Sequence, residues 1–94
     1  MLLQINYLIR SKKDGKYLVA RMPDNNGIES SYLLVFQHDY DAMSYINTHG
    51  KEFSDRLSVE TASPTQLKGL MQRWDYGGFG IVKDPLLPNI EFVS

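Results

Sequence analysis

The stretch Tyr32–Phe36 is the strongest constraint on how this chain can fold. Five apolar residues follow one another without interruption, and polar segments flank the run on both sides. Such a run is typical of a central β-strand that is covered on both faces, or of a strand whose outer face is unusually apolar. The fold is therefore expected to be built around a sheet that contains this strand.

Alternation and turn residues indicate the other strands. Residues 3–10 alternate apolar and polar side chains, which is typical of a half-buried strand, although an N-terminal helix is the alternative. A second strand is expected over residues 16–22, and Asp14-Gly15 favours a hairpin turn between the two. Further strands are predicted at 57–61, 79–83 and 90–93, after a polar loop at 23–31.

A first helix is predicted over Asp39–His49. Asp39 can act as the N-cap, and Gly50 can adopt the left-handed conformation that ends helices. Tyr40, Met43 and Ile46 would share one face of this helix, with Ala42 and Tyr45 beside it.

A second helix has the clearest local signals in the chain. Ser63 is followed by Pro64 and, three residues after the serine, by Gln66, which is the pattern of a capping box. The residues from Leu67 to Trp74 place apolar side chains in one stripe, and two glycines at 77 and 78 would end the helix.

The expected element order is β-β-β-α-β-α-β-β in a chain of 94 residues, which is the length of one domain, residues 1–94. Two helices are too few to cover both faces of a large sheet at this length. We therefore expect an α+β fold with an antiparallel or mixed five- to six-stranded sheet and both helices on one face. The other face would be solvated or covered by a partner.

Composition excludes several classes of function. The chain has no cysteine, so disulfide scaffolds, thiolate metal sites and cysteine nucleophiles are ruled out. Ten basic against eleven acidic residues argue against duplex nucleic acid as the main partner, and nucleic-acid binding would require the basic hairpin to align with Arg21 and Arg73 on one face. The apolar start of the chain is too short to span a bilayer and lacks the layout of a signal peptide, so we expect a cytoplasmic protein without a membrane partner.

The only group of candidate acid–base or metal-binding residues surrounds the first helix. His38 and His49 lie at opposite ends of that helix, about 16 Å apart at 1.5 Å per residue, so they cannot share one metal ion. We predict no catalytic residues, metal or cofactor. The alternative is a ligand-binding or enzymatic pocket between helix and sheet, with four residues near its mouth: His38, Asp39, Asp41 and Asp75.

Aromatic residues make up 12% of the chain, and tyrosines are favoured at protein interfaces. The absence of catalytic motifs and the near-neutral charge also favour a non-enzymatic interaction or regulatory module. We expect it to form a homodimer or to dock a protein partner through its sheet. The candidate contact residues are Tyr7, Tyr17, Tyr32 and Phe92. This prediction depends on one face of the sheet being free of helices.

From Tyr32 to Phe92, about two-thirds of the chain, the sequence resembles the SseB-type N-terminal domain. The resemblance is carried by the strand Tyr32–Phe36, by Asp41-Ala42, by the helix Leu67–Trp74 and by the ending Gly80-Ile81-Val82-Lys83-Asp84-Pro85. The first hairpin and the loop at Asn25-Asn26-Gly27 depart from the pattern. The resemblance implies a small intracellular α+β module that acts through contacts, with no catalytic residues to carry over.

Overall fold

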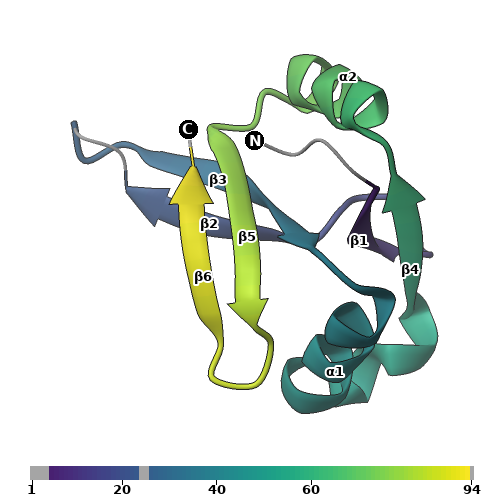
Figure 1. Cartoon of the computed structure of the whole chain (residues 1–94). Coiled ribbons are helices and arrows are strands. Elements are labelled where there is room, and N and C mark those ends of the chain that lie inside the picture. The colour runs from purple at the N-terminus through teal and green to yellow at the C-terminus, as the bar shows by residue number, and fades with distance from the viewer. Residues whose placement is uncertain (1–4, 24–25, 94) are drawn as a thin grey trace.

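The computed structural model describes residues 5–23 and 26–93 (Figure 1). The elements follow the predicted order, with one short 3₁₀ helix, η1, that the sequence pattern does not indicate. They are β1 (Asn6–Ser11), β2 (Val19–Pro23), β3 (Glu29–Phe36), α1 (Asp39–His49), η1 (Lys51–Arg56), β4 (Leu57–Ala62), α2 (Pro64–Trp74), β5 (Gly78–Asp84) and β6 (Asn89–Val93).

The strands form one mixed sheet of six strands, which confirms the predicted α+β class. Its order is β4-β1-β3-β5-β6, and β2 also pairs with β3. The central strand β3 runs parallel to β5 and antiparallel to both β1 and β2. The apolar run Tyr32–Phe36 is therefore an interior strand, as its sequence predicts.

The first strand ends in the expected turn, but the two strands that flank the turn soon separate. Gly15 has a φ of 72°, a conformation that glycine adopts without strain, and the Ser11 amide donates to the Lys16 carbonyl at 2.8 Å. An isolated Arg10–Tyr17 bridge joins the two segments. Along its length β1 pairs with β4, whereas β2 pairs with β3. Residues 6–11 thus form a strand rather than a helix, and residues 3 and 4 of the predicted strand lie outside the described residues.

The two helices lie on opposite faces of the sheet, so the prediction that both share one face is wrong (Figure 1). Leu34 and Phe36 pack with α1, whereas Leu33 and Val35 pack with Leu67 of α2. Successive side chains of a strand point to opposite faces, so these two sets define two separate cores. The physical reason is that both alternating sets of β3 are apolar, and each needs its own cover.

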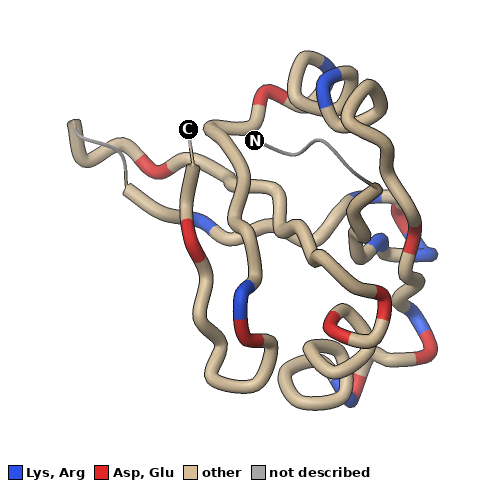
Figure 2. Tube along the Cα trace, viewed as in Figure 1, with Lys and Arg blue, Asp and Glu red and all other residues tan. Residues whose placement is uncertain are grey.

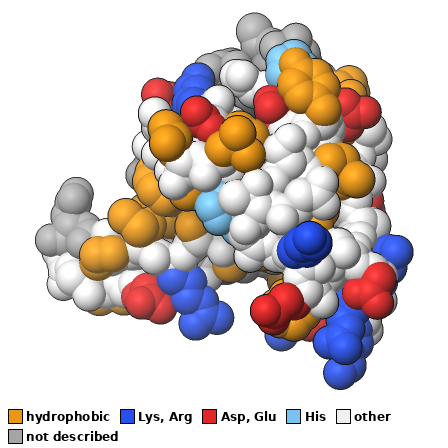
Figure 3. Space-filling model, turned by 90° about the horizontal axis from the view of Figure 1, so that it is seen from below, with side chains coloured by type: hydrophobic (Ala, Val, Ile, Leu, Met, Phe, Trp, Pro, Cys, Tyr) orange, Lys and Arg blue, Asp and Glu red, His pale blue; other side chains and the backbone are white. Residues whose placement is uncertain are grey.

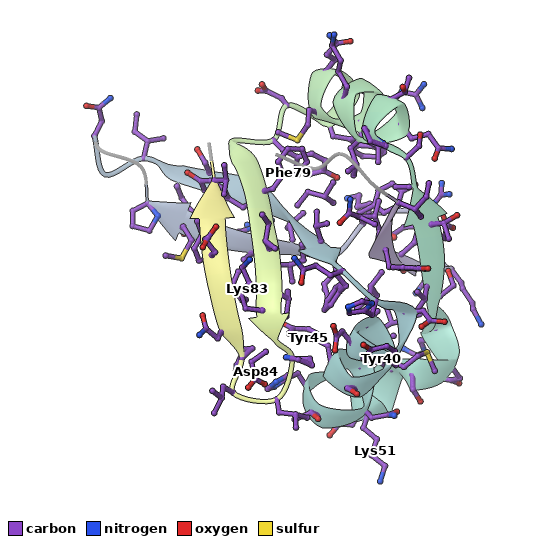
Figure 4. The ribbon with its side chains drawn as sticks, in the orientation of Figure 1. Tyr40, Tyr45, Lys51, Phe79, Lys83 and Asp84 are labelled. Carbon is purple, nitrogen blue, oxygen red and sulfur yellow. The ribbon has the colours of Figure 1, made fainter. Side chains whose placement is uncertain are left out.

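The two aromatic residues labelled near the two ends of β5 illustrate this division (Figure 4). Tyr45 reaches from α1 toward the end of β5, and its ring meets that of Phe36 edge to face at 5.4 Å between centroids. Phe79 lies at the start of β5 and packs against the core on the α2 side.

Helix α1 covers its predicted residues, but with a different buried face. His38 occupies the N-cap position without a side-chain capping bond, and Asp39, the predicted cap, is the first helical residue. Ala42 and Ile46 are buried, whereas Tyr40 and Met43 are 62% and 51% exposed. Of the predicted face, Ile46 reaches the core, and it does so together with Ala42 and Tyr45, the residues predicted beside that face, whereas Tyr40 and Met43 do not.

Helix α2 starts as predicted. The Gln66 amide donates to Ser63 Oγ at 3.2 Å, and the Ser63 amide donates to Gln66 Oε1 at 2.8 Å, which completes the capping box. The helix ends at Trp74, before the glycine pair at 77 and 78, because Asp75 itself adopts the left-handed conformation with φ 55°. Leu67 is buried, whereas Trp74 at the end of the predicted stripe is 41% exposed.

Candidate functional site

One end of the sheet projects beyond both helices. In Figure 1 the helices lie near β1, β4 and the second half of β3, whereas β2, the first half of β3 and the end of β6 extend away from them. The chain therefore leaves an uncovered end of the sheet rather than an uncovered face. A contact with a partner through a face of the sheet would use this end.

The strand register assigns the residues of this end to two sides. Ala20 lies opposite Tyr32 and Met22 lies opposite Ser30, while Gly80 is opposite both Leu34 on β3 and Phe92 on β6. Directly paired residues point to the same face, so all of these lie on the α1 side. We call Met22, Tyr32 and Phe92 the apolar strip.

Gly80, on the strand between Tyr32 and Phe92, leaves the space that the Phe92 ring occupies. The Tyr32 and Phe92 rings meet edge to face at 5.4 Å between centroids. A Cβ on Gly80 would lie 2.9 Å from Leu34 Cδ2 and 3.4 Å from Phe92 Cε1, so a larger residue would displace these side chains. Tyr32 is only 9% exposed, but Phe92 and Met22 remain 37% and 39% exposed.

The two sides of this end differ in their charged residues. On the α1 side, the described residues that β2, β3, β5 and β6 contribute to this end include no charged residue. Arg21, Glu29 and Glu91 point to the α2 side instead. Arg21 and Glu29 lie 3.9 Å apart there. Figure 2 shows how sparse charge is along β2, β3 and β6. In Figure 3, apolar side chains lie along the projecting end at the left, with charged side chains at its lower margin.

The four predicted contact residues do not form one surface. Tyr7 is half-buried against the α1-side core, and Tyr17 is half-buried against the α2-side core. Tyr32 and Phe92 do meet, and they form most of the apolar strip. Met22 is not among the predicted contact residues, although its alternation with Arg21, in a strand that pairs with β3, places it on the same side as Tyr32.

The residues of the predicted helix–sheet pocket are not brought together. His38 stacks on Tyr40 with ring centroids 4.9 Å apart, and Asp39 Oδ1 accepts from the Tyr40 amide at 2.7 Å. Asp75 follows α2, on the opposite face and near the start of β3, because Gly78 pairs with Tyr32. Among residues 5–23 and 26–93, no group of three or more His, Asp or Glu side chains could hold a metal ion.

His49 has a structural role at the end of α1. Its Nε2 atom lies 2.9 Å from the Pro85 carbonyl oxygen, and its ring lies against Tyr45 at 4.8 Å between centroids. The side chain therefore links the last turn of α1 to the turn between β5 and β6.

Comparison of the chain with protein-family models, with curated proteins and with solved structures finds no match. The resemblance to the SseB-type N-terminal domain therefore stays a prediction from the sequence pattern. Within the described part of the chain, neither helix has the length and apolar character needed to cross a bilayer.

Proposed function

We propose that this protein is a non-enzymatic interaction module that self-associates through the uncovered end of its sheet. The observation that carries the proposal is the apolar strip, an uncharged surface that neither helix covers. The proposal differs from the expectation from sequence in its location, because helices on both faces leave no open face for a partner.

A second copy of the same chain is the occupant that the charge pattern favours. The cores of protein interfaces are depleted of charged residues. In a two-fold contact each residue on the axis meets its own copy, so charges near the axis would repel. The α1 side of the uncovered end has no charged strand residue, and a symmetric contact there avoids this repulsion.

Pairing of two β6 edges is a less suitable way to form a dimer than contact through the apolar strip. An antiparallel pair centred on β6 would place Glu91, the middle residue of the strand, opposite its own copy. Like charges directly opposite each other destabilise a strand pair. We therefore expect the two copies to meet face to face through the apolar strip.

The contact is expected to be weak. Only Met22 and Phe92 of the apolar strip are substantially exposed, and stable interfaces bury roughly 800 Å² per partner. Sedimentation velocity over a wide range of protein concentration should therefore show a monomer–dimer equilibrium with a dissociation constant in the micromolar range or above.

The variant Phe92→Glu tests the location of this contact. It should raise the dissociation constant about tenfold or more, because it puts a charge at the centre of the contact. Leu87→Glu is the matched control, since Leu87 is an apolar residue of the β5–β6 turn that is 77% exposed and lies outside the strip. A strictly monomeric wild type, or equal weakening by both variants, would contradict the proposal.

A further inference from the structure

A pocket of about 320 Å³ lies on the α2 side, at the opposite end of the sheet from the apolar strip. Its walls come from four parts of the fold: β1, the segment around Tyr17, β4 and one stripe of α2. The α2 stripe consists of Gln66, Gly69, Leu70 and Arg73, which are spaced i, i+3, i+4 and i+7 and therefore lie on one helix face. The volume falls at the lower end of the range for small-molecule sites.

The sheet side of the pocket carries an ordered polar cluster. Arg10 Nη1 lies 3.4 Å from a Glu60 carboxylate oxygen, and its Nε donates to the Gly15 carbonyl at 2.9 Å. The Arg10 guanidinium also lies 5.1 Å above the centre of the Tyr17 ring. Arg10 therefore already balances the charge of Glu60, so this carboxylate is not a vacant site for a cation.

Tyr17 keeps a proton that it can donate. Burial, and secondly the negative charge of Glu60, raise the pKa of the Tyr17 hydroxyl above its usual value. The hydroxyl lies 3.4 Å from Glu60 Oε1, which is longer than a well-formed hydrogen bond between oxygens. The hydroxyl can therefore donate a shorter hydrogen bond to an acceptor in the pocket.

Arg73 supplies a positive charge that the fold does not use. The ion pairs in the described part of the chain are Arg10–Glu60 and Arg21–Glu29, and Arg73 forms neither an ion pair nor a hydrogen bond there. With Arg10 and Glu60 balanced, Arg73 leaves the pocket with one net positive charge. Guanidinium groups bind carboxylates with two parallel hydrogen bonds.

Gly69 opens the apolar side of the pocket. Glycine in a helix interior is destabilising relative to alanine, so it needs a reason there. No heavy atom lies within 4 Å of the position that a Cβ would occupy at Gly69, so close packing within the described chain does not explain it. Together with the half-buried Leu70, it leaves room for an apolar group against the helix.

We infer that this pocket binds a small organic anion, a carboxylate with an apolar body. The carboxylate would accept hydrogen bonds from the Arg73 guanidinium and the Tyr17 hydroxyl, and the apolar body would lie against Gly69 and Leu70. The inference is independent of self-association, because the pocket and the apolar strip share no residue.

The test is a titration of the full chain with benzoate, followed by the amide signals of an ¹H–¹⁵N NMR spectrum. Benzamide, which has the same shape without the charge, and inorganic phosphate are titrated in parallel. Benzoate should produce saturable shifts at Gly69 and Leu70, and benzamide and phosphate should bind at least about tenfold more weakly. Equal binding of benzamide would show that charge is not recognised, and equal binding of phosphate would show an adventitious ion only; either result overturns the inference.

Two variants test the pocket residues with matched controls. Arg73→Gln should weaken benzoate binding about tenfold or more, whereas Lys68→Gln removes the same charge from an exposed position of α2 outside the pocket and should not. Gly69→Ala should weaken binding while the melting temperature stays the same or rises, because the methyl group fills the pocket and favours the helix. Unchanged affinity in Arg73→Gln or in Gly69→Ala would overturn the inference.

Discussion

The two faces of the sheet differ in how their helices are held. On the α1 face, Ala42 and Ile46 are buried and Tyr45 packs on Phe36, but the helix start has no side-chain capping bond. On the α2 face, the helix begins with a complete capping box, yet Leu67 is the fully buried member of the helix and a pocket remains beside it. Helix α1 is stabilised mainly by packing, and α2 receives more of its stability from the capping hydrogen bonds at its N-terminus.

This difference has a functional consequence. Protein interiors are packed densely, so a well-packed face has no room for a ligand. A helix that is stabilised locally can stand partly away from the sheet, because it depends less on tertiary contacts. The pocket accordingly lies beside α2.

The largest effect that the comparison predicts concerns Ile46. Ile46→Ala should lower the free energy of unfolding by about 2–5 kcal/mol, because it removes buried methyl groups and leaves a cavity. Chemical denaturation of Met43→Ala provides the control, since Met43 is 51% exposed on the same helix. Similar losses for the two variants would mean that the buried face of α1 is assigned incorrectly.

An intermediate effect is expected at the start of α2. Ser63→Ala should lower the free energy of unfolding by about 1 kcal/mol, because the Gln66 amide loses its acceptor. Thr65→Ala, at an exposed position in the same helical turn, should change stability much less. If urea titrations give the two variants the same midpoint, capping contributes little to α2.

The smallest effect is expected at alkaline pH. Burial raises the pKa of Tyr45 in the folded protein, whereas an unfolded tyrosine titrates near pH 10. Above about pH 10 the unfolded chain therefore binds fewer protons at this residue than the folded chain, and stability falls as pH rises. Tyr45→Phe should make this fall less steep in denaturation series between pH 8 and about 11.

Tyr40→Phe is the control for this series, because Tyr40 lies on the same helix and is 62% exposed. A slope that is the same in Tyr45→Phe and in the wild type would show that Tyr45 does not contribute to the alkaline loss of stability.

Local signals in the sequence predicted most elements of the fold. Asp14-Gly15, Ser63 and Gln66 each act on backbone groups a few residues away, so their effect can be inferred without knowledge of the rest of the chain. The strand over Tyr32–Phe36 was found for a similar reason, since an unbroken apolar run has few other solutions.

The functional surfaces could be predicted only in part. Tyr32 and Phe92 were named as contact residues, but Tyr7 and Tyr17 were placed with them although they pack on opposite faces. The predicted pocket lies near His38, whereas the pocket in the structure is lined by Arg73 and Glu60, which are not among the predicted site residues. These residues are distant in the sequence and meet only through the pairing of β1 with β4 and the position of α2.

The sequence by itself determined the strands and the two α-helices, their order and the interior position of β3, because hydrogen bonding and capping are short-range and the apolar run requires burial. The tertiary structure alone decided which face each helix covers, where the sheet is left uncovered and which charges share a pocket. These features depend on strand register and on the crossover between β3 and β5, in which contacts join residues far apart along the chain.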